Sequence, residues 1–356
     1  MNRIVIASDS FKGTFTSMEV ADSVEKGIRT VCPDCDVVKL NVADGGEGTM
    51  SAICESQPHE TVALEVSDPL GRRIIASYAI LGDGTAVVEM SGASGLTLLT
   101  PQERNPLNTS TYGTGEMIAD ALSKGCRRFL IGIGGSATND AGIGMLSALG
   151  YRFLDDKGQT LPCVGGSLSQ ISSIDTSAVN PCLKESEFTV ACDVDSPLYG
   201  PSGAAYVFAP QKGASDEIVT ELDAGLRHFA ELTGADACFS GAGAAGGLGF
   251  ALKIFMNANL ERGIDIVLDS IGFDQVVAGS DLVITGEGCY DGQTSAGKTV
   301  HGVISRAGRY GVPVIVIAGS VGIGKMDADV ICAGECGRYA SARDIEHAIA
   351  RYLAAR

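Results

Sequence analysis

Charged and glycine-rich residues gather in residues 286–299, whose sequence is GEGCYDGQTSAGKT. Lys298 follows Gly297 at a position where we expect a helix to begin, and free backbone N–H groups at a helix start attract anions. Glu287 and Asp291 lie on the same segment, and carboxylate oxygens suit Mg²⁺. These residue types predict a loop that binds metal-bound phosphate groups. The alternative is a polar turn with a solvated Lys298.

The end of this segment, residues 292–299, fits the phosphate-loop template G-x-x-x-x-G-K-[ST]. We nevertheless expect no P-loop fold. The preceding strand is expected to end at Thr285, which leaves residues 286–291 between the strand and the first template glycine. The chain also ends at residue 356, without an apolar strand that could supply the second, magnesium-holding aspartate. We therefore interpret the segment as a phosphate-binding loop of another fold.

Polar residues also follow two apolar segments near the start of the chain. Ser10 and Lys12 come after residues 3–8, and Asp44 comes after residues 37–42. Open α/β sheets bind ligands at the carboxyl ends of their strands. We therefore expect these side chains to converge with the charged residues of the glycine-rich loop described above. Each of them alone would be compatible with an ordinary surface charge.

Two further apolar segments, residues 128–133 and 188–192, also end in polar residues. The first is followed by glycines and short polar side chains, whose backbone N–H groups can form an anion-binding concavity. The residues predicted to bind phosphate there are Gly134, Gly135, Ser136, Thr138 and Asn139. The second is followed by Asp193, a carboxylate that can accept a proton from a substrate hydroxyl. The alternatives are a tight turn at the first position and a turn-capping aspartate at the second.

Residues 241–246 fit the dinucleotide template G-x-G-x-x-G. The segment before them, residues 233–240, is a poor strand, so the template lacks its structural context. We expect these glycines to allow close backbone packing at a helix start. An NAD-dependent oxidoreductase remains an alternative of another class.

The elements that must position these loops predict an α/β fold. Strand and helix patterns alternate at both ends of the chain, and capping boxes at residues 16–19 and 341–344 mark two helix starts. Short turns in the middle permit antiparallel pairing. We expect a Rossmann-like, doubly wound domain built from residues 1–65 plus 265–356. Residues 66–264 would form an inserted mixed α/β domain, with the active site in the cleft between the two domains.

The composition limits the function classes. The net charge is −17 and the pI is near 4.6, without the basic stripe of a nucleic-acid binder. No apolar run is long enough for a membrane span, and the start of the chain reads as a strand rather than a signal peptide. We expect a cytoplasmic protein with reduced thiols, in which Cys32 and Cys35 are two ordinary cysteines. The sequence fits either a monomer or a homodimer.

Five blocks of sequence, in this order, resemble the bacterial glycerate kinase family. They are residues 9–13 (DSFKG), 43–49 (ADGGEGT), 133–140 (IGGSATND), 241–249 (GAGAAGGLG) and 284–288 (ITGEG). Asp291, Gln293, Thr294, Gly297 and Lys298 fit the last motif of the family as well. The resemblance covers nearly the whole chain. Three positions depart from the pattern: the family usually has Arg at Cys289, a small aliphatic residue at Tyr290 and Asn at Ser196.

The resemblance implies ATP-dependent phosphorylation of D-glycerate by a two-domain protein that uses Mg²⁺ and is not a P-loop enzyme. The product expected is 2-phosphoglycerate, with phosphorylation of the 3-hydroxyl or of a related hydroxy acid as alternatives. A non-catalytic nucleotide sensor is a further alternative. The expected roles are as follows. Asp193, Lys12 and Lys298 are catalytic; Ser10, Lys12, Arg72 and Asp44 bind the substrate; Gly134, Gly135, Ser136, Thr138, Asn139, Gly286, Glu287, Gly297 and Lys298 bind the nucleotide; and Asp44, Glu287 and Asp291 hold the metal.

Overall fold

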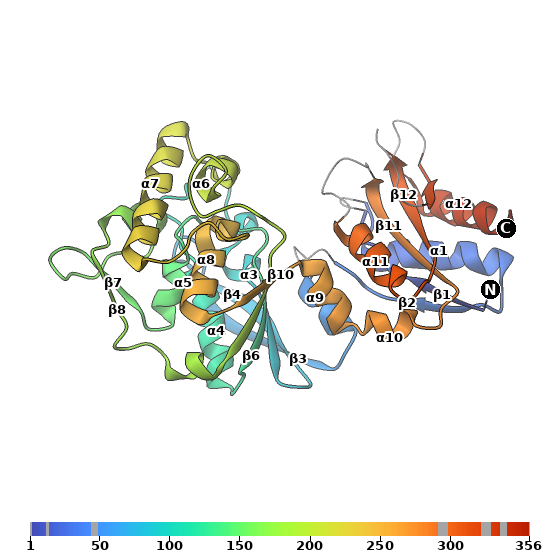
Figure 1. Ribbon diagram of the computed structural model, residues 1–356, viewed down its shortest axis with the longest axis horizontal. Helices are drawn as coiled ribbons and strands as arrows, with labels where there is room; N and C mark the ends of the chain where they lie inside the picture. Colours follow the sequence, from blue (N-terminus) through green and yellow to red (C-terminus); the bar gives the residue numbers. More distant parts are fainter. Residues whose placement is uncertain are drawn as a thin grey trace. The chain divides into compact units, whose positions relative to one another are not determined.

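The computed structural model describes residues 2–11, 14–43, 49–290, 298–321, 329–334 and 340–355. The chain forms two compact units, each with its own main sheet (Figure 1). The first unit consists of Met1–Asp44, Ser51–Gln57 and Ile264–Arg356, and the second of Gly45–Met50 and Pro58–Gly263. The first unit therefore combines segments from both ends of the chain.

The first unit is built on a five-stranded parallel sheet with the order β13-β12-β11-β1-β2. Its strands are β1 (Arg3–Ile6), β2 (Asp36–Lys39), β11 (Leu282–Tyr290), β12 (Val314–Val321) and β13 (Asp329–Cys332). This is the order of an open, doubly wound sheet in which the direction of winding reverses between β1 and β11. The predicted α/β fold with a Rossmann-like sheet is confirmed.

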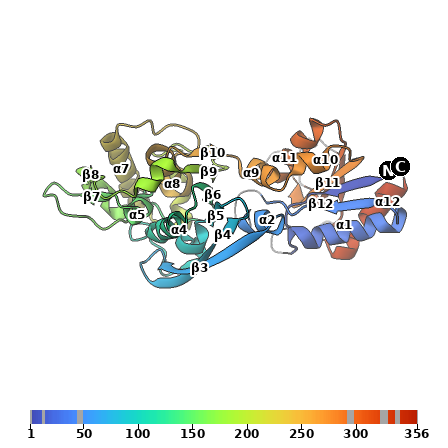
Figure 2. The same ribbon diagram turned by 90° about the horizontal axis from the view of Figure 1, so that it is seen from below.

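Helices cover both faces of this sheet. The helices of this part of the fold are α1 (Ser17–Val31), α2 (Thr49–Glu55), α9 (Gly263–Ser270), α10 (Phe273–Val277), α11 (Lys298–Gly308) and α12 (Ala342–Ala354), of which α1, α11 and α12 contact the sheet. Figures 1 and 2 show α1 and α12 side by side on one face and α11 on the other. Both predicted capping boxes are confirmed, with Thr16 paired to Glu19 and Ser341 paired to Asp344. The helices bury an apolar core that includes Ile4, Ile28, Ile284, Ile315 and Ile345.

Strand β11 is longer than the sequence predicted. We expected it to end at Thr285, but it continues to Tyr290 because β12 pairs with it over the added length, from Gly286 opposite Ile317 to Tyr290 opposite Val321. The glycines at 286 and 288 hide this extension, since glycine is depleted in strands. The gap that we expected between this strand and the phosphate-loop template is therefore wrong.

The cysteines at the end of α1 also differ from the expectation. Cys32 and Cys35 form a disulfide, with their Cα atoms 5.5 Å apart. The tight turn after the helix brings them together, and the Cys35 N–H donates to the Cys32 carbonyl at 3.3 Å. The prediction of two free thiols at these positions is wrong.

The second unit contains a six-stranded mixed sheet with the order β10-β9-β6-β5-β4-β3 (Figure 2). Its strands are β3 (His59–Ser67), β4 (Arg73–Leu81), β5 (Thr85–Glu89), β6 (Arg128–Gly132), β9 (Glu187–Ala191) and β10 (Asn259–Glu261). β3, β4 and β5 pair antiparallel, whereas β5, β6, β9 and β10 are parallel. The parallel strands therefore direct the loops that follow them to a common edge.

Helices and a small two-stranded sheet complete the second unit. The small sheet pairs β7 (Arg152–Leu154) with β8 (Ser173–Asp175). The α-helices are α3 (Ser91–Ser94), α4 (Tyr112–Ser123), α5 (Ile143–Ala148), α6 (Ala204–Phe208), α7 (Asp216–Thr233) and α8 (Ala244–Met256), and the 3₁₀ helices are η1 (Leu96–Leu98), η2 (Gly165–Gln170), η3 (Pro181–Glu185) and η4 (Pro210–Lys212). Across the described ranges, no helix has the length and apolar character that crossing a membrane requires.

Candidate active site

The carboxyl edge of the second sheet gathers the predicted phosphate loop and Asp193. Gly132, the last residue of β6, pairs with Ala191, the last residue of β9. Gly134 and Asp193 each lie two residues beyond this pair, so adjacent parallel strands deliver them to the same edge. The sheet register thus brings together two groups that are far apart in sequence.

The loop after β6, residues 133–142, is held from the side of β5. The Leu96 N–H donates to the Gly135 carbonyl, and the Ala137 N–H donates to the Ser94 carbonyl, both at 2.9 Å. The Thr109 hydroxyl donates to the Ala137 carbonyl at 3.0 Å. Gly135 has a φ of 72°, a conformation that favours glycine. The loop is therefore a fixed structure within the second unit.

Asp140 closes the loop as a fully buried carboxylate. It accepts hydrogen bonds from the Thr111 N–H and the Thr111 hydroxyl, both at 2.8 Å, and from the N–H groups of Gly142 and Gly144, both at 3.2 Å. Burial raises the pKa of Asp140, and these hydrogen bonds oppose the rise. The carboxylate ties the loop to the starts of α4 and α5.

Lys212 lies beneath the same loop and was not predicted as a functional residue. Its side chain is buried, and its Nζ donates to the Ser136 hydroxyl and to the Thr138 carbonyl, both at 2.7 Å. Burial lowers the pKa of Lys212 to about 7, against the opposing effect of the Asp140 charge. The residues next to Lys212 in the sequence give no signal of this role. Only its contacts with Ser136 and Thr138, which are far away in the chain, identify it.

Thr138 and Asn139 are completely buried polar residues in this loop. The Thr138 hydroxyl and both polar atoms of the Asn139 amide have no hydrogen-bond partner among the described residues. A buried polar group without a partner costs about 1–3 kcal/mol. Such groups require an explanation in a native structure, and a loop that gains partners when a ligand binds provides one.

The glycines that fit the dinucleotide template pack the start of α8 against this loop. Gly246 has a φ of 67°, and a Cβ at this position would lie 2.1 Å from the Thr138 carbonyl oxygen. Its own carbonyl accepts a hydrogen bond from the Ala141 N–H at 3.0 Å. A Cβ at Gly243 would lie 2.3 Å from the Pro197 carbonyl oxygen. The expectation of close backbone packing at a helix start is confirmed.

Asp193 is anchored at the edge of the sheet by a backbone group. One of its carboxylate oxygens, Oδ1, accepts a hydrogen bond from the Gly263 N–H at 3.1 Å. Asp195, two residues on, instead accepts a hydrogen bond from the Ser240 hydroxyl at 2.6 Å. The two aspartates therefore have different partners despite their proximity in sequence.

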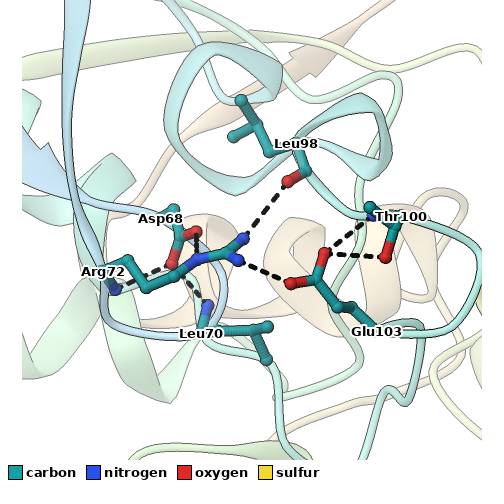
Figure 3. Close-up of polar contacts among 6 residues, drawn as sticks. All are labelled: Asp68, Leu70, Arg72, Leu98, Thr100 and Glu103. Carbon is teal, nitrogen blue, oxygen red and sulfur yellow. Dashed lines mark hydrogen bonds and ion pairs between the residues drawn. The ribbon is translucent and has the colours of Figure 1, made fainter.

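Arg72, which we expected to bind the substrate carboxylate, is already paired (Figure 3). Its Nε bonds to the buried Asp68 carboxylate at 2.5 Å, and its Nη1 bonds to Glu103 at 2.6 Å. Its Nη2 donates to the Leu98 carbonyl at 3.3 Å. The guanidinium holds the turn after β3 against the segment that follows η1. These contacts give Arg72 a structural role and leave little of its charge for a substrate.

Arg104 is a cation in the same region that the sequence did not single out. Its Nε is buried and has no hydrogen-bond partner among the residues that the structure describes. Its backbone carbonyl lies close to Gly213, the residue that follows Lys212. A Cβ at Gly213 would lie 2.3 Å from the Arg104 carbonyl oxygen. A guanidinium N–H without a partner is suited to bind an anion.

In the first unit, the loop after β1 meets β11 and the start of α11. The Asp9 N–H donates to the Gly286 carbonyl at 2.9 Å, and the Asp9 carboxylate accepts hydrogen bonds from the Ser10 N–H at 2.7 Å and the Thr299 hydroxyl at 3.0 Å. Glu287 is buried, at 7% exposure. Asp9 and Ser10 follow β1, and Glu287 lies in the last part of β11. A doubly wound sheet of this order binds ligands between these two strands.

Several predicted site residues lie outside the described ranges. They are Lys12, Asp44, Asp291 and Gly297. Lys298 is the first residue of α11, as the sequence predicted. Across the part of the chain that the structure describes, no group of three or more His, Cys, Asp and Glu side chains is arranged to hold a metal ion.

Polar residues at the carboxyl ends of parallel strands, as after β1, β6 and β9, are typical of the class of α/β proteins that bind small-molecule ligands. The model of the glycerate kinase family matches residues 4–348. A glycerate kinase of Bacillus subtilis (strain 168) is 49% identical over 325 residues, which cover 90% of this chain and 85% of the relative. A glycerate 2-kinase of Escherichia coli (strain K12) is 46% identical, with the same coverage.

A solved structure gives the same result at the level of the fold. The crystal structure of a Salmonella typhimurium LT2 protein, named provisionally as glycerate kinase 2, matches with a TM-score of 0.89 and 43% identity. The match covers 99% of this chain and 98% of that chain. The chain belongs to the glycerate kinase family.

Proposed function

We propose that this protein transfers the γ-phosphoryl group of ATP to the 2-hydroxyl of D-glycerate, which yields 2-phosphoglycerate and ADP. Its similarity to relatives named glycerate kinase and glycerate 2-kinase supports this activity. The structural observation that carries the proposal is the polar loop of residues 133–142, which shares one sheet edge with Asp193. Phosphoryl transfer depends mainly on positioning and charge stabilisation, and this edge offers groups for both.

The loop after β6 is the proposed phosphate-binding element. Backbone N–H groups in glycine-rich loops form concavities that bind anions. The residues assigned to it are Gly134, Gly135, Ser136, Thr138 and Asn139. The buried and unpaired groups of Thr138 and Asn139 support a loop that acquires partners with its ligand.

Asp193 is the proposed general base. The glycerate hydroxyl oxygen attacks the γ-phosphorus, the bond from that phosphorus to the bridging oxygen of ADP breaks, and the hydroxyl proton passes to the Asp193 carboxylate. One carboxylate oxygen is held by the Gly263 N–H, so the group has a defined orientation. A positioned base within reach of a hydroxyl is the requirement for this role.

Arg104 is the proposed partner for the carboxylate of glycerate, in place of Arg72. Arg72 bonds to two carboxylates, whereas the Arg104 Nε has no partner among the described residues. A hydrogen bond to a charged group contributes about 1.5–3 kcal/mol. Lys12 and Ser10 remain candidates for the same substrate on the basis of the family resemblance.

Arg104→Met should therefore raise the KM for D-glycerate by about tenfold to a hundredfold, as the loss of one charged hydrogen bond implies. Arg72→Met is the matched control, since it removes the same type of side chain at a position where the guanidinium is already paired with carboxylates. It should change the KM for D-glycerate by less than about twofold. Initial rates at saturating ATP measure both values. A larger rise in KM for the Arg72 variant than for the Arg104 variant would indicate that Arg72 binds the glycerate carboxylate.

The first unit supplies the remaining candidates. Oxygen ligands suit Mg²⁺, and the Glu287 carboxylate is of this kind and is buried at the carboxyl end of its sheet. Glu287, with Asp44 and Asp291, would hold the ion, which would neutralise phosphate charge when bound. Gly286, Gly297 and Lys298 remain the proposed phosphate contacts of this unit, and Lys12 and Lys298 the catalytic cations.

The direct test is ADP release from Mg-ATP, with and without D-glycerate, followed by ³¹P NMR of the product. Glycerate-dependent ADP release with phosphate on the 2-hydroxyl is the expected result. A 3-phosphate product would move the reaction to the other hydroxyl. ATP binding without glycerate-dependent ADP release would indicate a nucleotide sensor, and binding of NADH without ATP turnover would indicate an oxidoreductase. From the composition and the start of the sequence, we also infer a cytoplasmic protein that is a monomer or a homodimer.

A further inference from the structure

Lys212 is buried to an extent that is unusual for a lysine. It is 2% exposed, and lysines are almost never fully buried unless they are paired. The backbone holds it in place, because the Lys212 N–H donates to the Ala209 carbonyl at 3.0 Å and the following Gly213 adopts a φ of 92°. Its aliphatic stem cannot withdraw to solvent without disturbing this turn.

The partners of Lys212 all belong to the phosphate loop. Its Nζ donates to the Ser136 hydroxyl and the Thr138 carbonyl, each at 2.7 Å. The charged group that acts on it is Asp140, from the same loop, whose carboxylate is engaged by the N–H groups and hydroxyl described above. The amine therefore lies behind the loop and would influence a ligand through Ser136 and Thr138 rather than by contact.

We propose that Lys212 is a proton-linked positioning residue: it takes up a proton when phosphate groups bind to the loop after β6, and its charge then stabilises the bound anion from behind. This inference rests on the proposed function, because it assumes that the loop binds phosphate. The hydrogen bonds to Ser136 and Thr138 hold the amine against the loop. Protonation of the amine therefore makes the electrostatic potential at the loop more positive.

The direction of the pH dependence follows from linkage. Burial lowers the pKa of Lys212 to about 7 without ligand, and a nearby anion raises the pKa of a lysine. Below about pH 7 the amine is already charged, so binding needs no proton. Above that pH the free protein has lost the proton and must regain it on binding, so the Kd for ATP should rise by up to about tenfold per pH unit until the pKa of the bound state is passed.

Isothermal titration calorimetry at pH 8, in two buffers that differ in their heat of ionisation, measures this proton uptake directly. The titrant is Mg-ATP, whose terminal phosphate is almost fully ionised at this pH. The unmodified protein should take up a substantial fraction of one proton for each ATP bound. Lys212→Met, which is apolar and of similar length, should bind ATP more weakly and take up less. Any uptake that it retains belongs to other groups.

Two outcomes would overturn the inference: no proton uptake by the unmodified protein at pH 8, or equal uptake by the Lys212→Met variant with its fold intact by circular dichroism. The measurement on the unmodified protein does not depend on whether the variant folds. Lys212→Arg is a second variant that keeps its charge at all pH values, so its ATP affinity should be nearly independent of pH between 7 and about 9.

The same samples separate this inference from the proposed function. Glycerate-dependent ADP release without proton uptake would support the kinase activity and contradict the proposed role of Lys212. Proton uptake on ATP binding without glycerate-dependent ADP release would support Lys212 and remove the kinase activity. Absence of ATP binding would contradict both.

Discussion

Asp193→Asn should lower kcat by about 10²–10⁴-fold, the range that general base catalysis contributes. Asparagine has nearly the same shape, and its carbonyl oxygen can still accept the hydrogen bond that Asp193 receives from the Gly263 N–H at 3.1 Å. It cannot accept a proton from the glycerate hydroxyl. The affinity for ATP should therefore change by less than about twofold, as for a substitution that leaves the packing intact. Steady-state kinetics and a separate ATP titration measure the two quantities.

Asp195→Asn is the matched control for this variant. Asp195 lies two residues away, and its carboxylate accepts a hydrogen bond from the exposed Ser240 hydroxyl at 2.6 Å. We expect its kcat to stay within about twofold of the unmodified value. If Asp193→Asn retained normal turnover, or if both variants lost activity equally, Asp193 would not be the base.

Gly246→Ala should reduce kcat/KM by about 10²-fold, because a shift of about 1 Å at a catalytic position can cost that much. A Cβ at Gly246 would lie 2.1 Å from the Thr138 carbonyl oxygen and 2.5 Å from the Asn139 Cα. Both atoms belong to the backbone, so the loop itself has to move. The substitution also places a non-glycine residue at a φ of 67°, which costs about 1–2 kcal/mol.

Gly234→Ala separates these two effects. Gly234 has a φ of 64°, but a Cβ there would meet nothing within 4 Å. It therefore carries the same backbone strain without the overlap. We expect it to lower the free energy of unfolding by about 1–2 kcal/mol and to leave kcat/KM almost unchanged. Urea unfolding and initial rates on both variants make the comparison, and equal loss of activity in the two would argue that Gly246 does not position the loop.

Two glycine-rich segments fit short ligand-binding templates although the surrounding structure differs from the folds that define those templates. Residues 292–299 fit a phosphate-loop template, yet the chain belongs to the glycerate kinase family, which the resemblance marks as having no P-loop. Residues 241–246 fit a dinucleotide template, and in the structure Gly243 and Gly246 allow close contact with backbone carbonyls. In both cases the glycines need their structural context before they indicate a ligand.

The sequence by itself determined the local features of this protein. The capping boxes at Thr16 and Ser341, the alternation of strands and helices at both ends, and the polar loops after β6 and β9 could all be predicted, because each depends on residues close together in the chain. Five blocks of sequence in a fixed order were also sufficient to indicate the family. These features defined the α/β fold and most of the candidate site.

The tertiary structure decided which charged side chains are free to act. Arg72 and Arg104 cannot be distinguished by residue type, but Asp68 and Glu103 neutralise the first, while the Nε of the second has no partner among the described residues. Lys212 becomes part of the site through Ser136, which is 76 residues away. Strand β11 extends to Tyr290 because β12 pairs with it. Burial, pairing and the pKa of a side chain depend on neighbours that folding brings together from distant parts of the chain, and local sequence does not contain them.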